Sequence, residues 1–376
     1  MLRVAFIDQT GAQAGGAQES FALLLAHLPS FIEPRVVVFQ DGDYAARLRA
    51  LGIDLTVFPV SESFRDSKRE AAAIGGMLSM PAAIVRLASW LRRERMDAVY
   101  THTIKAHFLG APAARLAGKP CVMHLRDILE GRAKSALRLV ALACAPERIA
   151  ISKAVAQAYA LRSTSVVVNP LDLRDYLQLP SRHAARELLG IPDDGLPVVG
   201  IVGRINRWKG HDRYLRIAAH VRERVDARFA IVGAPIFRDA DFVAELEESC
   251  DSLGLRDRVT FVPWTRDMKA VYAALDVHCN CSTREPFGRT IVEAAVAGVP
   301  TVCFSDAGAT DVLTDGRDAC IVAAGDENAF AIALTGLLED SRLMATVSEG
   351  ARGLAAVFEP AGHALQVAEI LRKAAA

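Results

Sequence analysis

The chain has 376 residues, of which 52% are hydrophobic and 23% are charged, a composition that supports large cores and excludes an extended disordered protein. Lys plus Arg and Asp plus Glu both number 44, so the formal net charge is zero, and a general nucleic-acid-binding protein is excluded. The seven cysteines lie mostly in apolar runs, which argues against a disulfide framework and for a reducing compartment. The length allows two or three domains.

The first residues lead straight into a short apolar run, without a signal-peptide pattern. No apolar run reaches the roughly 18 residues that a membrane span needs. We therefore expect a cytoplasmic protein. Residues 64–95 are basic and contain aromatic side chains. They fit either a plain surface helix or peripheral contact with the inner face of an anionic membrane.

Short apolar runs alternate with helical patterns through the first half of the chain. Leu2–Ile7 predicts a strand buried on both faces, and the glycine-containing segment 11–16 then leads into a helix with an apolar stripe. Glycines in this position allow backbone N–H groups to approach a ligand, although a flexible loop explains them equally well. Further strands are predicted at Val36–Phe39, Ile53–Phe58, Asp97–Thr101, Cys121–Leu125, Arg148–Ile151 and Ser165–Val168. Repeated strand–helix units indicate a parallel sheet covered on both faces.

Ligands of such sheets bind at the carboxyl ends of the strands. Polar residues that follow predicted strands are therefore candidate site residues, although each also fits an ordinary polar residue at a strand end. They are His102, His124, Arg126, Asp127, Ser152 and Asn169.

The alternation stops at 173–196, which we interpret as an interdomain linker because it carries proline, glycine and charge. It restarts with predicted strands at Pro197–Gly203, Phe229–Val232, Val259–Val262, Asp276–Cys281, Thr301–Phe304 and Ile321–Ala323. The sequence thus predicts an α/β protein with domains at 1–172 and 197–356. The remaining residues, 357–376, contain a terminal helix.

Gly203 and Arg204 end the first strand of the second domain, and Lys209 precedes a helix. Two cations and the N–H groups of a helix start suit a diphosphate, because Arg binds two oxygens at once and Lys acts as a point charge. The alternative is a helix preceded by solvated cations.

The segment Arg284–Pro300 places Glu285 in a loop and Glu293 about one turn inside a helix. Carboxylates beside an anion site are suited to accept hydrogen bonds from sugar hydroxyls. The alternative is a capped amphipathic helix with two solvated acids. On the strand before this loop, His278, Cys279 and Cys281 lack the second ligand pair of a zinc site, so we expect no metal.

The second half resembles the retaining glycosyltransferases of the GT-B fold, family 4, also called glycosyltransferases group 1. Glu285-Pro286-Phe287-Gly288, with Glu293 eight positions after Glu285, matches that family's carboxylate motif completely. Gly203-Arg204 and Lys209-Gly210 match its diphosphate motif, and the Gly15–Gln18 tetrapeptide matches a loop of its first domain. Two departures are Pro170 and Ala309, which stand where the family usually has glycine.

The resemblance implies two Rossmann-like domains facing each other across a cleft, with the last helix crossing back to the first domain. It implies transfer of a sugar from a nucleoside-diphosphate sugar to an acceptor glycan, glycolipid or small molecule, with retention of configuration. No cofactor, obligatory metal or nucleic acid is implied. The product would belong to a cell-surface polysaccharide or glycoconjugate. A nucleotide-sugar 2-epimerase and a non-catalytic sugar-nucleotide-binding subunit stay open as alternatives.

The resemblance also implies roles for individual residues. Arg204 and Lys209 would stabilise the departing diphosphate, Glu285 would contact the donor sugar, and Glu293 would hold the ribose. His124 would lie by the reacting carbon and the acceptor hydroxyl, and Trp264 would lie against the base. The complete donor-binding set is Gly15, Gly16, Gly203, Arg204, Lys209, Trp264, Glu285, Pro286, Phe287, Gly288, Arg289, Thr290 and Glu293. The acceptor-side set is His102, Arg126, Asp127, Ser152 and Asn169.

Overall fold

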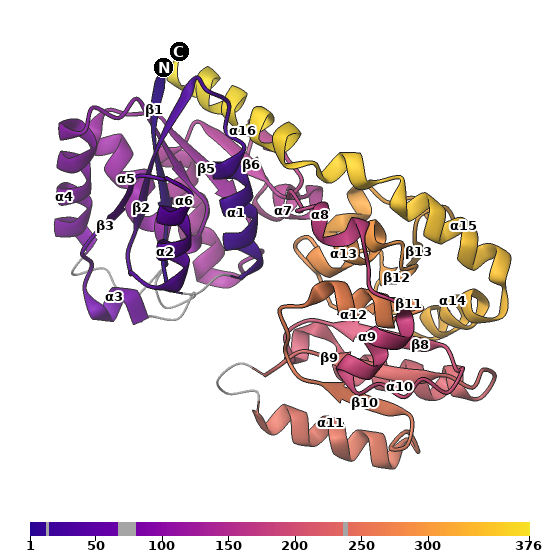
Figure 1. Ribbon diagram of the computed structural model, residues 1–376. Helices are drawn as coiled ribbons and strands as arrows, with labels where there is room; N and C mark the ends of the chain where they lie inside the picture. The colour runs from indigo at the N-terminus through magenta and orange to yellow at the C-terminus, as the bar shows by residue number, and fades with distance from the viewer. Residues whose placement is uncertain (13–14, 67–79, 236–239) are drawn as a thin grey trace. The chain divides into compact units, whose positions relative to one another are not determined.

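The computed structural model describes residues 1–12, 15–66, 80–235 and 240–376 (Figure 1). The chain divides into two compact units. Unit 1 comprises Met1–Leu171 and Phe358–Ala376, and unit 2 comprises Asp172–Val357. Unit 1 is therefore built from both ends of the described chain, and unit 2 from one continuous segment.

Unit 1 is organised on a seven-stranded parallel sheet with the order β3-β2-β1-β4-β5-β6-β7. The central strands β4 and β5 are fully buried, as expected for apolar runs covered on both faces. The strands are β1 (Leu2–Asp8), β2 (Ile32–Val38), β3 (Leu55–Val57), β4 (Ala98–Thr101), β5 (Cys121–Leu125), β6 (Glu147–Ala150) and β7 (Thr164–Val166).

Helices cover both faces of this sheet. On one face, Phe6 and Tyr100 share a core with α1 (Gly16–Ala26), α2 (Asp43–Ala50) and α16 (Pro360–Ala375). On the other, α5 (Ile104–Ala117) approaches so closely that a side chain at Gly110 would overlap Ile7 and Thr101. The helices α4 (Met80–Arg93), α5 and α6 (Gly131–Cys144) are neighbours. Two short helices, α3 (Glu62–Asp66) and α7 (Lys153–Tyr159), complete the unit.

Unit 2 repeats the architecture with six parallel strands in the order β10-β9-β8-β11-β12-β13. The strands are β8 (Val198–Val202), β9 (Arg228–Val232), β10 (Val259–Val262), β11 (Val277–Asn280), β12 (Thr301–Phe304) and β13 (Cys320–Val322). Around them lie α8 (Arg174–Leu177), α9 (Arg182–Leu189), α10 (His211–Arg222), α11 (Ala240–Ser252), α12 (Met268–Ala274), α13 (Arg289–Ala297), α14 (Glu327–Glu339) and α15 (Ser341–Arg352). Three short 3-10 helices, η2 (Arg207–Lys209), η3 (Gly308–Asp311) and η4 (Ala355–Phe358), join them.

One expectation from the sequence differs from the structure. Residues 173–196, interpreted as a linker, contain α8 and α9 and belong to unit 2. The physical reason is the contact of α9 with α12, together with buried Arg186, which forms ion pairs with Asp193 (2.8 Å) and Asp276 (2.7 Å). The polar residues of this segment therefore belong in part to a helix that ion pairs hold within unit 2, and the segment is not a linker.

Within the described residues, none of the helices has the length and apolar character that crossing a bilayer requires. Part of the basic segment 64–95, residues 67–79, lies outside the described residues. The remainder contains the end of α3 and all of α4.

Candidate active site

In unit 2 the two sequence motifs meet through their loops. The loop after β8 leads through η2 to α10, and the loop after β11 leads to α13. Gly210 has a φ of +74°, and a side chain there would lie 2.2 Å from the Cys281 carbonyl oxygen, so only glycine allows this approach. The Thr283 N–H donates to the Trp208 carbonyl (3.1 Å). This backbone contact brings Lys209 to Glu285.

The ammonium of Lys209 lies 2.6 Å from Glu285 Oε2. The side chains are only 15% and 7% exposed, respectively, so water screens the pair weakly. The same ammonium lies 4.3 Å from the ring centroid of Trp208, a residue that the sequence analysis did not assign to the site. A lysine directly after an exposed tryptophan is the signal that was available for this cation–π contact.

The Glu285–Gly288 loop is held by a second loop. The backbone N–H groups of Gly308 and Ala309 donate to the carbonyls of Glu285 (2.9 Å) and Phe287 (2.5 Å). Phe287 is buried, whereas Pro286 is partly exposed. Gly288, at φ +89°, then starts α13. The motif thus combines a fixed carboxylate with a helix N-terminus, and the alanine at position 309 retains the needed backbone donor.

Glu293 lies inside α13 and is 5% exposed. Its Oε2 accepts from the Tyr272 hydroxyl (2.9 Å), and its Oε1 accepts from Arg289 Nε (2.6 Å). In the first turn of α13, the buried Thr290 hydroxyl oxygen has no hydrogen-bond partner among the described residues. The motif therefore presents an engaged carboxylate and a hydroxyl available for a ligand at the same helix start.

The other donor-site candidates of unit 2 lie near the surface. Gly203, at φ +151°, adjoins the aliphatic stem of Lys209, and Arg204 is exposed. Trp264 is 62% exposed after β10, with the guanidinium of Arg266 5.8 Å from its ring centroid. Within the described part of unit 2, Trp264 makes no hydrogen bond, ion pair or ring contact with Lys209 or Glu285.

In unit 1, Asp8 at the end of β1 gathers several side chains. It accepts hydrogen bonds from Gln18 Nε2 (3.2 Å) and Thr103 Oγ1 (3.2 Å). His102 Nε2 lies 3.1 Å from Asp8 Oδ2, although the two groups are not aligned for a hydrogen bond. Burial lowers the pKa of His102 and the Asp8 carboxylate opposes that shift. The sequence analysis named His102 but missed Asp8, whose position at the end of the first strand was the available signal.

Gln18 also connects this cluster to the glycine loop. Its side-chain oxygen accepts a hydrogen bond from the Gly15 N–H (3.2 Å), and Gly16 begins α1. The backbone at Gly15–Gly16 is therefore tied to Asp8 through one amide side chain, as a positioned loop rather than a freely flexible one.

His124 is fully buried at the end of β5. Its Nδ1 lies 2.5 Å from the Tyr100 hydroxyl, and its ring stacks on His363 of α16 at 6.2 Å. Its Nε2 has no partner among the described residues. Burial, followed by the charge of Arg126, lowers the pKa of His124 well below its usual value. A direct contact with a substrate would need a local opening, because the ring is inaccessible.

The other acceptor-side candidates do not all join His124. Arg126 donates to Asn169 Oδ1 (2.6 Å), and both are largely buried. Ser152 caps α7 by accepting from the Val155 N–H (3.1 Å), which is the ordinary structural role for serine at a strand-to-helix junction. The side chain of Asp127 is partly exposed.

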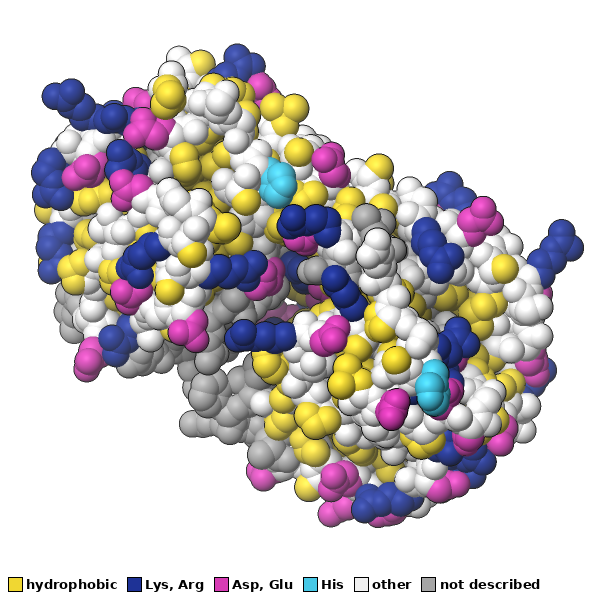
Figure 2. Space-filling model, in the orientation of Figure 1, with side chains coloured by type: hydrophobic (Ala, Val, Ile, Leu, Met, Phe, Trp, Pro, Cys, Tyr) yellow, Lys and Arg dark blue, Asp and Glu magenta, His cyan; other side chains and the backbone are white. Residues whose placement is uncertain are grey.

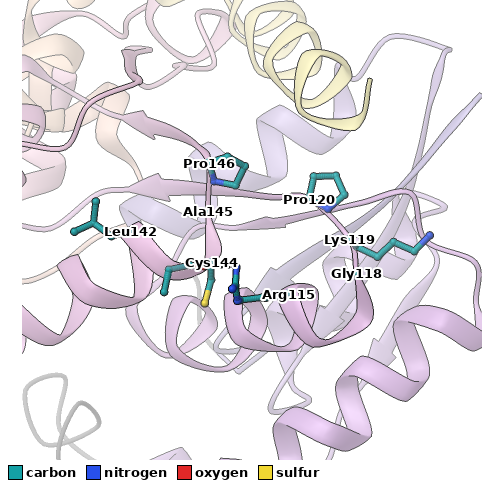
Figure 3. Close-up of a pocket in the computed structure, with 9 residues that line it drawn as sticks. Arg115, Gly118, Lys119, Pro120, Leu142, Cys144, Ala145 and Pro146 are labelled. Atoms are coloured by element: carbon teal, nitrogen blue, oxygen red, sulfur yellow. Dashed lines mark hydrogen bonds between the residues drawn. The ribbon is translucent and has the colours of Figure 1, made fainter.

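A surface cavity lies at the opposite edge of the same sheet, before the starts of β5 and β6 (Figure 3). It has a volume of about 440 Å³ and is lined by Arg115, Gly118, Lys119, Pro120 and Leu142–Pro146. None of the candidate site residues lines it. Among the described residues, no group of three or more His, Cys, Asp or Glu side chains is arranged to hold a metal ion.

Two family models match the chain. The model described as Glycosyl transferase 4-like domain matches residues 15–171, and the model described as Glycosyl transferases group 1 matches residues 196–340. The chain belongs to the group 1 glycosyltransferases. The recognised family and the α/β fold are thus confirmed, and the two sheets correspond to the GT-B fold.

Relatives and solved structures of this glycosyltransferase family agree with that assignment. The D-inositol 3-phosphate glycosyltransferase of Stackebrandtia nassauensis is 29% identical over 72% of this chain and 62% of its own length. A D-inositol 3-phosphate glycosyltransferase 2 of Catenulispora acidiphila is 30% identical over 75% of this chain and 66% of its own. The chain thus spans less than two thirds of these relatives. Anabaena Alr3699/HepE in complex with UDP superposes with a TM-score of 0.84 at 28% identity, covering 99% of this chain and 100% of that one.

Proposed function

We propose that this group 1 glycosyltransferase moves a sugar from a nucleoside-diphosphate sugar to an acceptor hydroxyl with retention of anomeric configuration. The observation that carries the proposal is the Lys209–Glu285 pair, which puts a cation and a carboxylate 2.6 Å apart beside two helix starts. A diphosphate suits the cation, and a sugar bearing hydroxyl groups suits the carboxylate.

The leaving diphosphate would be stabilised by the protein's own positive groups. Lys209 supplies a buried charge, Arg204 supplies an exposed guanidinium, and α13 supplies N–H groups and the unpartnered Thr290 hydroxyl. Such preorganised donors lower the energy of charge that develops in the transition state. We therefore propose that transfer proceeds without an obligatory metal ion.

Glu285 and Glu293 divide the remaining donor contacts in this proposal. Glu285 lies in the loop and would accept hydrogen bonds from the sugar that is transferred. Glu293 lies inside α13 and would hold the ribose hydroxyls. Both carboxylates keep free lone pairs after their present contacts, because each oxygen can accept about two hydrogen bonds.

We propose that unit 1 binds the acceptor. The carboxyl ends of the parallel strands share one edge of the sheet, where ligands of such folds bind. At or just after these ends lie Asp8, His102, His124, Arg126 and Asn169. Two relatives are named for D-inositol 3-phosphate and lipopolysaccharide core transfer, which supports a polar acceptor in glycoconjugate biosynthesis. Transfer at the inner face of the cytoplasmic membrane is part of this proposal.

The first test is thermal denaturation with UDP, GDP or ADP in the presence of a chelator. A ligand at 100 times its Kd should stabilise the folded state by about 2.7 kcal/mol. The absence of any shift with all three would contradict the donor site. Incubation with the stabilising nucleotide sugar alone, and then with acceptor, separates a transferase from an epimerase and from a binding subunit. The anomeric configuration of the product tests retention.

A further inference from the structure

Tyr272 contacts the carboxylate that we assign to the ribose but belongs to neither sequence motif. It lies in α12 and is fully buried, and its hydroxyl donates to Glu293 Oε2 at 2.9 Å. The Thr290 carbonyl lies 3.3 Å from the same hydroxyl. A phenol has one proton, and the shorter contact to a charged acceptor is the stronger of the two. The Tyr272 proton therefore points at Glu293.

Two donors hold this carboxylate from different sides. Arg289, one turn earlier on α13, donates to Oε1, and Tyr272 donates to Oε2. Two contacts on the two oxygens fix the rotation of the carboxylate plane, which a single contact leaves free. Arg289 is partly exposed whereas Tyr272 is buried, so Tyr272 is the more rigid of the two anchors.

The surroundings of Tyr272 keep its ring in place. The ring packs at 5.9 Å on Tyr176 of α8 and edge-on at 6.2 Å on His278 of β11. Burial, reinforced by the Glu293 charge, raises the pKa of Tyr272 well above its usual value, so the hydroxyl remains a proton donor across the physiological range. Packing between α12, α8 and β11 therefore holds the Tyr272 hydroxyl in a fixed position beside the Glu293 carboxylate.

We propose that Tyr272 is a positioning residue, which presets the Glu293 carboxylate for the ribose of the nucleotide donor. This inference rests on the donor site proposed above. Without the phenol, the ligand itself would have to order the Glu293 carboxylate. The lost conformational entropy would then make the free energy of donor binding less favourable. The contact is the same before and during transfer, so its loss weakens donor binding without slowing the bound complex.

The test is Tyr272→Phe, which removes one oxygen and keeps the ring packing. The matched control is Tyr214→Phe, because Tyr214 is also fully buried in unit 2 but donates to the backbone carbonyl of Val199 (2.8 Å). We expect Tyr272→Phe to raise the donor KM and the nucleoside-diphosphate Kd about fivefold to tenfold, as for the loss of a hydrogen bond to a charged group. Turnover should stay within about twofold, and the control should leave all three constants within about twofold.

A double-mutant cycle separates positioning from general damage. In the Glu293→Gln background, Tyr272→Phe should add less than about a twofold change in KM, because the group it positions is already altered. An unchanged KM in the single variant, or the same loss in both backgrounds, would overturn the proposal. Absence of nucleoside-diphosphate binding by the unaltered protein would instead overturn the donor site itself.

Discussion

Glu285 and Glu293 are both buried carboxylates on one loop and helix, yet they are held by different partners. Glu285 is paired with Lys209, the group that we propose also binds the donor diphosphate. Glu293 is held by Arg289 and Tyr272, which have no donor group to bind in our proposal. Donor binding should therefore redistribute charge around Glu285 and leave the environment of Glu293 largely as it is.

Replacing the two carboxylates should give opposite kinetic patterns. Glu285→Gln should lower turnover by about 100-fold, because a carboxylate near a sugar that gains positive character stabilises the transition state. The same variant should bind a bare nucleoside diphosphate severalfold more tightly, since Lys209 no longer has to leave an ion pair with a largely buried carboxylate. Glu293→Gln should mainly raise the donor KM.

Steady-state kinetics with varied donor, together with titration calorimetry of the nucleoside diphosphate, would measure both effects. The matched comparison is internal, because the two glutamates lie eight residues apart and undergo the same substitution. Identical or reversed kinetic patterns would show that the assignment of roles is wrong, even though the chain is a group 1 glycosyltransferase.

The sequence located the motif residues but not the side chains that hold them. Lys209, Glu285 and Glu293 could be named because each stands at a fixed spacing from glycines and a helix start. Tyr100 and Tyr272 could not be named, because their partners His124 and Glu293 are 24 and 21 residues away and become neighbours only when helices and strands pack. Motif spacing and hydrophobic periodicity describe neighbours along the chain and do not predict such tertiary contacts.

At the scale of elements, α5 and α6 form an unusual surface in unit 1. Neither helix contains an acidic residue, and three leucines, Leu116, Leu139 and Leu142, are 46–68% exposed on them. The adjacent cavity adds Arg115 and Lys119 (Figure 3). Dark blue Lys and Arg side chains also lie along the edge where α4 is found (Figure 2). Exposed leucines among cations suit the interface of an anionic bilayer.

This surface gives a prediction for membrane contact. The full chain should float with vesicles containing anionic lipid and remain unbound with zwitterionic vesicles, because both apolar and electrostatic terms are needed. Leu139→Asp with Leu142→Asp should reduce binding at least about tenfold, since each removes an exposed apolar side chain that would enter the bilayer and adds a negative charge that anionic lipid repels.

The control is Ile332→Asp, which changes a 71% exposed residue of unit 2 in the same way. Equal loss with this control, or binding to zwitterionic vesicles, would contradict contact through α5 and α6. If the unaltered protein proves to be a dimer and the leucine variants are monomers, this surface would instead be assigned to a second copy of the chain.

At the scale of the molecule, buried neutral histidines should make stability fall with acid. Burial lowers the pKa of His107 and His278 to about 3, and of His211 and His363 to about 4. Their contribution is complete above the unfolded pKa of about 6.5. As pH falls below that value, the unfolded chain binds protons that the folded chain does not. The free energy of unfolding should then drop by about 1.4 kcal/mol per group and pH unit.

Urea denaturation at pH 7, 6 and 5 would measure this slope. His107→Gln should reduce the slope of unfolding free energy against pH by about 1.4 kcal/mol per pH unit, which corresponds to one proton. His183→Gln should not reduce it, because His183 is exposed and its pKa is raised by Asp193. A free energy of unfolding that does not change between pH 7 and pH 5 would show that these rings bind protons in the folded protein as readily as in the unfolded chain.

The fold itself was readable from sequence to a greater extent than the site. Each of the thirteen strands of the described sheets overlaps a predicted apolar run, and the agreement is good for central strands such as β4 and β5, because a strand buried on both faces is apolar. The start of β2 was missed, because Glu33, Pro34 and Arg35 interrupt its apolar pattern. The helices α8 and α9 were missed because their stability comes from tertiary contacts that a polar sequence does not reveal. Helix α9 is held by the ion pairs of Arg186 and by packing on α12, and α8 packs on α12 and α13.

The return of α16 to unit 1 has a consequence for how the protein is made. The side chains of Val367 and Leu371 complete the core around Phe6 and Phe21, and they leave the ribosome after all of unit 2. Unit 1 is begun first but cannot be finished until 186 intervening residues, 172–357, have been synthesised. Because domains tend to fold as they emerge, the nascent chain should hold a folded unit 2 while unit 1 still exposes the apolar groove that its last helix will fill.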